Sequence, residues 1–187
     1  MVPVVSLWMP ILLSAVLAFL ASSVIHMATS FHKGDIRKLP NEDDAMDAVR
    51  RLNLAPGDYG APLPGSRGGM NAPEFQAKML KGPRFLITVM AAGPMSMGSQ
   101  LVQWFLFLVV VAIFTAYVTG LAHGPGTEYL RVFQVAGCVS FMGYSFAAIP
   151  NSIWWKRNWG MTIRMLVDGL LYGLLTAGTF GWLWPKM

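Results

Sequence analysis

The sequence predicts an all-α integral membrane protein, a four-transmembrane-helix bundle with a helical cytoplasmic loop between spans one and two. Three observations lead to this fold class. Apolar residues make up 55% of the 187 residues and charged residues only 12%, whereas soluble domains carry about 25% charged residues. The apolar residues gather into four long blocks, which is the pattern of membrane spans and not of amphipathic helices. Most of the charged residues lie between these blocks.

Each apolar block is long enough to cross a hydrocarbon layer of about 30 Å, which takes about 20 helical residues. Pro150 and Pro185 are predicted to end the third and fourth spans, because proline cannot continue a helix. No Lys or Arg precedes the first block, so we interpret it as an uncleaved span and not as a signal peptide. The whole chain, residues 1–187, is expected to form a single membrane domain with spans at 4–26, 101–121, 129–150 and 161–184.

The cytoplasmic segment at residues 27–98 is too long for a simple turn. Residues 42–53 are predicted to form a short helix, because acidic side chains occupy its first turn and arginines its last. The Pro- and Gly-rich stretch at 55–73 is expected to be irregular. A second short helix is predicted at 73–80, followed by a short extended segment at 85–90.

The distribution of basic residues predicts the orientation in the membrane. An even number of spans puts both termini on one side. Nine Lys or Arg lie between Lys33 and Arg84 and three more between Lys156 and Arg164, whereas the opposite face carries only Arg131 and Lys186. By the positive-inside rule, both basic segments are cytoplasmic. We therefore expect a multi-pass protein of the bacterial cytoplasmic (inner) membrane with both termini on the outer side.

Small residues at four-residue steps predict faces for helix packing, because helices in lipid associate by close approach. Two interpretations stay open: the stripes hold the four helices to each other, or the stripe of the fourth span binds another protein. The predicted packing residues are Gly169, Gly173, Ala177 and Gly181 in the fourth span and Ala112, Ala116 and Gly120 in the second.

Two further groups are candidate sites. Asp168 lies inside the fourth span, where a carboxylate is costly and often functional. An ion pair with Arg164, one turn away, is the expected structural solution, and a contact with a partner or cofactor or a role in proton transfer are the alternatives. A cluster of aromatic and basic residues predicts interfacial contact with lipid head groups; it comprises Trp154, Trp155, Lys156, Arg157 and Trp159.

The sequence favours no catalytic site. His26 and His32 are six residues apart, which fits neither one helical face nor a known zinc spacing, and His123 is predicted at the opposite membrane face. No phosphate loop, nucleophile elbow or thiol pair is present in the sequence. We therefore expect no metal, no enzymatic activity and no cofactor, with bound membrane lipids as the expected ligands. The basic residues flank the apolar blocks among acidic ones, so no nucleic-acid partner is expected.

The segments SSVIHM, HKGDIRKLPNEDDAMDAVRRL, NSIWWK and VDGLLYGLLTAGTFGWLWP resemble those of a family of uncharacterised four-span bacterial integral membrane proteins. The resemblance covers nearly the whole chain and is most specific in the last span. It implies bacterial origin and a four-span topology, and it implies no activity or functional residue.

These observations predict a non-catalytic accessory or scaffold subunit of a larger bacterial membrane protein complex. An energy-transducing assembly, photosynthetic or respiratory, is the expected setting. The alternative is a small homo-oligomeric transporter or channel, or a lipid-binding membrane protein. The sequence shows few polar residues near the midplane of its spans, which disfavours transport.

Overall fold

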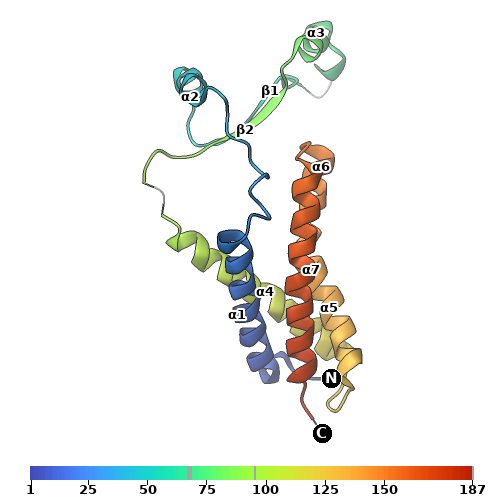
Figure 1. The fold of residues 1–187 in the computed structure, drawn as a ribbon. Coiled ribbons are helices and arrows are strands. Elements are labelled where there is room, and N and C mark those ends of the chain that lie inside the picture. Colours follow the sequence, from blue (N-terminus) through green and yellow to red (C-terminus); the bar gives the residue numbers. More distant parts are fainter. Residues whose placement is uncertain (67–68, 95, 187) are drawn as a thin grey trace. The chain divides into compact units, whose positions relative to one another are not determined.

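The computed structural model describes residues 1–66, 69–94 and 96–186, and it divides into two compact units. The helical unit comprises Met1–Ile36 and Ser96–Met187, and the linking unit comprises Arg37–Met95. Figure 1 shows the two units, which we describe separately.

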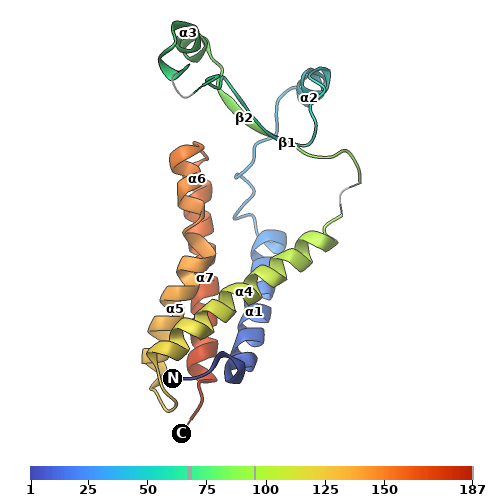
Figure 2. The same cartoon turned by 180° about the vertical axis from the view of Figure 1, so that it is seen from behind.

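The helical unit contains four helices that are long and apolar enough to cross a membrane: Val4–Ala28, Gly98–Ala122, Tyr129–Trp154 and Trp159–Trp182. The first begins with a 3-10 turn, η1 (Val4–Leu7), continues as α1 (Trp8–Ser23) and ends in a π-helical turn, η2 (Val24–Ala28). The second is α4 (Gly98–Ala122) and the fourth is α7 (Trp159–Trp182). Both chain termini lie at the same end of this unit (Figures 1 and 2).

The third of these helices is interrupted. α5 (Tyr129–Ser145) is followed, after a break at residues 146–147, by α6 (Ala148–Trp154). Pro150 does not end the span as predicted. It lies in the first turn of α6, where its missing N–H has no helical acceptor to lose and its fixed φ suits the helix. The helical path therefore extends four residues beyond Pro150.

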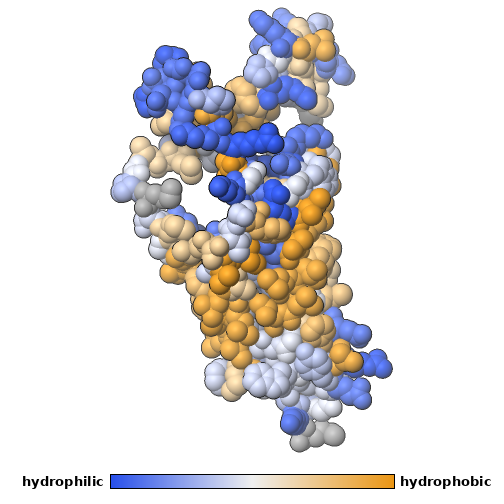
Figure 3. All heavy atoms as spheres, in the orientation of Figure 1, coloured by the Kyte–Doolittle hydropathy of each residue, from blue (hydrophilic) through white to orange (hydrophobic). Residues whose placement is uncertain are grey.

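The four long helices contact one another in a closed ring: α1 with α4, α4 with α5, α5 with α7, and α7 with α1. Inside the ring the buried side chains are mainly small or hydroxylated, such as Ala112, Thr115 and Thr176. Several of these hydroxyls donate to backbone carbonyls of their own helix, as Thr115 does to Val111 at 2.9 Å. Many large apolar side chains lie on the outside, which Figure 3 shows as an apolar (orange) covering of the visible side of the helices. This distribution suits a lipid environment, where packing and not hydrophobic burial joins helices.

The linking unit contains α2 (Glu42–Arg51), β1 (Gly57–Ala61), a 3-10 turn η3 (Gly69–Asn71), α3 (Pro73–Lys81) and β2 (Phe85–Val89). The two strands pair antiparallel, with Gly57 opposite Val89 and Ala61 opposite Phe85. The two short helices and the extended segment lie close to their predicted positions. β1 was not predicted: it occupies part of the Pro- and Gly-rich stretch that was expected to be irregular.

Candidate functional site

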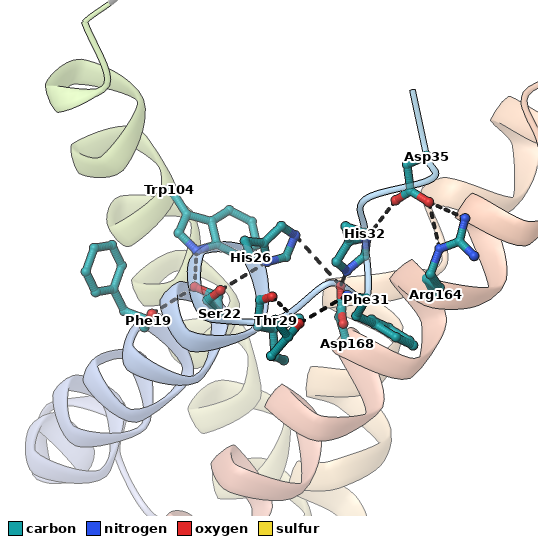
Figure 4. A network of polar contacts seen from close by, with 11 residues as sticks. Phe19, Ser22, His26, Thr29, Phe31, His32, Asp35, Trp104, Arg164 and Asp168 are labelled. Carbon is teal, nitrogen blue, oxygen red and sulfur yellow. Dashed lines mark hydrogen bonds and ion pairs between the residues drawn. The ribbon is translucent and has the colours of Figure 1, made fainter. Parts of the chain in front are cut away.

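A cluster of titratable side chains lies at the end of the helical unit opposite the termini (Figures 1 and 4). It begins with η2, the π-helical turn that carries His26. Such turns are rare and are often found at functional sites. The chain then turns at residues 30–36, where Lys33 N–H donates to Ser30 and Asp35 N–H to His32. These turns return the chain over η2, so that the rings of His26 and His32 stack with centroids 4.3 Å apart.

His32 lies between two carboxylates. Its Nδ1 is 2.6 Å from Oδ2 of Asp35 and its Nε2 is 2.8 Å from Oδ2 of Asp168, which belongs to α7. All three side chains are largely buried, with exposed fractions of 14%, 10% and 7%. Asp35, from the loop that follows the first helix, and Asp168, from the last helix, thus meet at the imidazole of His32 (Figure 4).

The ion pair expected between Arg164 and Asp168 is not the one that forms. Arg164 binds Asp35, donating from Nε to Oδ1 at 2.6 Å and also pairing through Nη2. Asp168 faces His32 and, at 3.9 Å, Nε2 of His26. Arg164 and Asp168 are neighbours one turn apart in α7, but the 29–36 segment supplies each of them with a partner distant in sequence.

Hydrogen bonds connect His26 to the first helix and, through Ser22, to the second helix. Its Nδ1 is 3.0 Å from the carbonyl oxygen of Ser22, and the hydroxyl of Ser22 accepts a hydrogen bond from Nε1 of Trp104 at 2.9 Å. Trp104 belongs to α4. The cluster therefore connects α1, α4 and α7 through side chains (Figure 4).

The two carboxylates of the cluster, Asp35 and Asp168, differ in how well their charges are compensated. Burial raises the pKa of Asp35. The hydrogen bonds from His32 and Arg164 and the positive charge of Arg164 lower it by more than burial raises it, so that the pKa of Asp35 lies below the ordinary 3.8. Asp35 is thus a carboxylate with two good partners. Asp168 is different, because its Oδ1 is buried without a hydrogen-bond partner among the residues that the structure describes. A buried carboxylate oxygen without a partner is costly.

A cavity of about 310 Å³ adjoins the cluster, with Asp168 and His26 in its wall. The rest of the lining is mainly apolar or aromatic and includes Met27, Leu101 and Met165. Apolar cavities with a few convergent polar groups are the usual form of small-molecule sites. The hydroxyl of Tyr172, another lining residue, also has no hydrogen-bond partner in the described part of the chain.

The predicted packing stripes lie at helix contacts within the chain. A Cβ added at Gly173 would lie 3.3 Å from backbone atoms of Phe141 in α5, and one at Gly181 would meet the ring of Tyr129. Ala112 and Ala116 of α4 are fully buried, and Gly120 lies against the carbonyl of Val2. The stripe of α7 thus faces α5.

The other predicted residues do not join the cluster. Trp154, Trp155 and Trp159 have exposed fractions of 75%, 58% and 53%, and Lys156 and Arg157 beside them are exposed. His123 lies apart from the other two histidines, with Nε2 3.1 Å from the carbonyl of Arg131. The partners that sequence reasoning missed are His32 and Asp35. The only signal for them is that a histidine and an aspartate follow closely after the first apolar block.

Comparison with protein-family models, with curated proteins and with solved structures gives no match to this chain. The function is therefore inferred from the helices, the linking unit and the cluster alone.

Proposed function

We propose that the protein is a non-catalytic accessory or scaffold subunit of a larger bacterial membrane complex, and that the linking unit is its docking part. One observation carries the proposal: no described residue of Arg37–Met95 is buried, although this segment forms two helices and a strand pair. Folded elements without a core need an outside surface to cover them.

The linking unit exposes several large apolar side chains. Leu63, Leu80 and Met90 have exposed fractions of 68%, 88% and 82%. A two-stranded sheet is at most marginally stable by itself in water. The short helices α2 and α3 have no buried residue to hold them either. Burial of these apolar faces against a partner would supply the missing stabilisation.

The charge of the linking unit favours a protein partner over a lipid surface. Residues 37–95 contain eight Lys or Arg and six Asp or Glu, interleaved along the segment. Segments that bind anionic lipids usually carry clusters of four to eight basic residues without such compensation. Mixed charge around exposed apolar residues is the composition of a protein interface with a polar rim.

The proposal also covers the orientation of the protein, its membrane and the kind of complex. The excess of basic residues in the linking unit and around Lys156 to Arg164 supports a cytoplasmic side for both and an outer side for the termini. The resemblance to four-span bacterial proteins supports the bacterial inner membrane. A photosynthetic or respiratory complex is the setting we propose, because such assemblies contain small subunits that carry no catalytic group.

The test is to purify the tagged full-length protein from its native membrane in mild detergent and to identify the chains that elute with it. We expect larger proteins at a fixed ratio, and an absorption spectrum that names the complex if pigment or haem is present. Leu80→Asn should reduce the recovered partner, whereas the neighbouring Lys81→Asn should not. A particle that contains only copies of this chain would contradict the proposal.

A second candidate function is the binding of a lipid or another amphiphile, favoured by the cavity of about 310 Å³ with polar groups at one wall. Native mass spectrometry of the purified protein would reveal a retained ligand. Ser23→Phe, which would narrow the cavity, should then remove that ligand. Retention by the variant would show that the ligand binds elsewhere.

A further inference from the structure

The stacked histidines and Asp168 form a set of three candidate metal ligands. The ligand atoms of His26, His32 and Asp168 all lie within 4.8 Å of one another. We propose that these three residues bind one divalent transition-metal ion of the zinc type at the end of the helical unit. Two imidazole nitrogens and one carboxylate oxygen are a donor set that such ions take. The proposal revises the expectation of no metal, which rested on spacing alone, and it does not depend on the proposed function.

The hydrogen bonds of both histidines leave the same nitrogen free. The carboxylate of Asp35 and the carbonyl of Ser22 act as acceptors, so the Nδ1 atoms of His32 and His26 carry the protons that bind them. Each Nε2 is then an unprotonated acceptor close to Asp168. Histidines that bind metals almost always donate their other N–H to a carboxylate or a backbone carbonyl. Asp35 is in turn held by Arg164, which fixes the orientation of His32.

The contact between His32 and Asp168 is poorly explained without a cation. A neutral His32 with its proton on Nδ1 places an acceptor, Nε2, 2.8 Å from another acceptor, Oδ2. The geometry is also unsuitable for a hydrogen bond, because Nε2 has no hydrogen-bond partner among the described residues despite this short distance. Asp168 Oδ1 is likewise buried and unpartnered. A positive ion bound by His32 Nε2 and Asp168 Oδ2 would relieve the contact between these two acceptors.

The distances fit an ion shared by the three residues. Bonds of about 2.0–2.1 Å in a tetrahedral site separate neighbouring ligand atoms by about 3.3 Å. The two separations from Asp168 Oδ2, 2.8 Å to His32 and 3.9 Å to His26, lie on either side of this value. Two ligands of one ion also point at the ion and not at each other. With such bonds and the 2.8 Å between His32 Nε2 and Asp168 Oδ2, the line from Nε2 to the ion makes an angle of about 45° with the line from Nε2 to Oδ2. The lone pair of Nε2 would therefore point to the side of Oδ2.

Binding requires one small rearrangement. The two imidazole planes are 9° from parallel, and each lone pair lies in the plane of its ring. The rings must therefore tilt toward each other for both Nε2 atoms to reach one ion. His26 can make this movement, because half of its side chain is exposed. Three protein ligands leave a fourth position free, and the cavity beside His26 and Asp168 could supply a water or a small ligand to it.

The test uses the full-length protein in detergent, treated with a chelator, dialysed and then titrated with Zn²⁺ or Co²⁺. We expect one ion per chain by elemental analysis and, with Co²⁺, a visible absorption spectrum that reports nitrogen and oxygen ligands. Asp168→Asn and His32→Ala should weaken Zn²⁺ binding by more than about 100-fold, since loss of an outer partner alone costs about 10–100-fold. Asp35→Asn should fall within that smaller range. His123→Ala, which removes a histidine outside the cluster, is the matched control and should bind as the parent does.

His26→Ala keeps the test decisive if a buried substitution prevents folding. This side chain is half exposed, so the variant should fold and still lose the ion. Absence of a bound ion in the parent protein would overturn the proposal. Equal binding by the His26, Asp168 and His123 variants would overturn it as well, because the ion would then lie elsewhere.

Discussion

Gly173 is the position where the packing of α7 on α5 can be tested most directly. An added Cβ would lie 3.3 Å from the N, Cα and Cβ atoms of Phe141, all in or next to the backbone of α5. Backbone atoms cannot rotate away as the end of a side chain can. Gly173→Ala therefore has to push the two helices apart by a few tenths of an ångström. The stripe of small residues predicts this close approach, and the structure supplies the neighbour.

The expected magnitude follows from two opposing terms. Alanine is favoured over glycine inside a helix by about 0.5–1 kcal/mol. Overpacking a tight contact costs about 1–3 kcal/mol. Gly173→Ala should thus lower the free energy of unfolding by roughly 0.5–2 kcal/mol. Gly178→Ala is the matched control in the same helix, because its Cβ would meet only the hydroxyl of Tyr129 at an ordinary 3.6 Å.

The control removes the helix propensity from the comparison. Both variants gain the same preference of alanine for the helix, so the difference in their unfolding free energies is the overpacking term, about 1–3 kcal/mol. The assay is reversible unfolding in mixed micelles, followed by circular dichroism as the denaturing detergent is increased. If Gly173→Ala is as stable as Gly178→Ala, then α7 and α5 do not approach as closely as the structure shows, and the reasoning fails.

Three further predictions concern the cluster, its pH dependence and the orientation. Trp104→Phe should lower the unfolding free energy by about 0.5–1.5 kcal/mol, the usual value of one hydrogen bond, because it loses the bond to Ser22; in a double-mutant cycle with Ser22→Ala an additive result would contradict this. Since the pKa of Asp35 is lowered in the folded protein, the unfolded chain takes up the proton first as the pH falls, so stability should be complete above pH 3.8 and decline below it. Asp35→Asn should flatten this decline, and an unchanged profile would refute the assignment. In a variant without the native cysteine, a cysteine at Glu128 should react with an impermeant thiol reagent added outside intact cells and one at Lys156 should not; the reverse pattern would invert the orientation.

The spans are a local property of the sequence, which is why they were predictable. A helix needs about 20 consecutive apolar residues to cross the membrane, and this requirement is met or failed within each block. The apolar helices Val4–Ala28 and Gly98–Ala122 extend the predicted spans by at most three residues at either end. The short helix Pro73–Lys81 is also close to its predicted range. Signals carried by neighbouring residues sufficed in each case.

Pairings between distant residues were decided only by the tertiary structure. β1 was missed because its ladder with β2, from Gly57 opposite Val89, is not visible in a stretch rich in Pro and Gly. The partner of Arg164 was missed for the same reason, since Asp35 lies 129 residues away. Local reasoning assigned Arg164 to Asp168 because both lie on one face of one helix.

The sequence by itself thus determined that four helices can cross a membrane and which of their faces are small enough to pack. Hydrophobicity and residue size act over a few turns of helix, so they can be assessed without knowing the fold. Only the tertiary structure placed His32 between Asp35 and Asp168, because that contact depends on the direction in which the chain turns after η2. No periodicity or spacing encodes this turn, and the candidate metal site exists only through it.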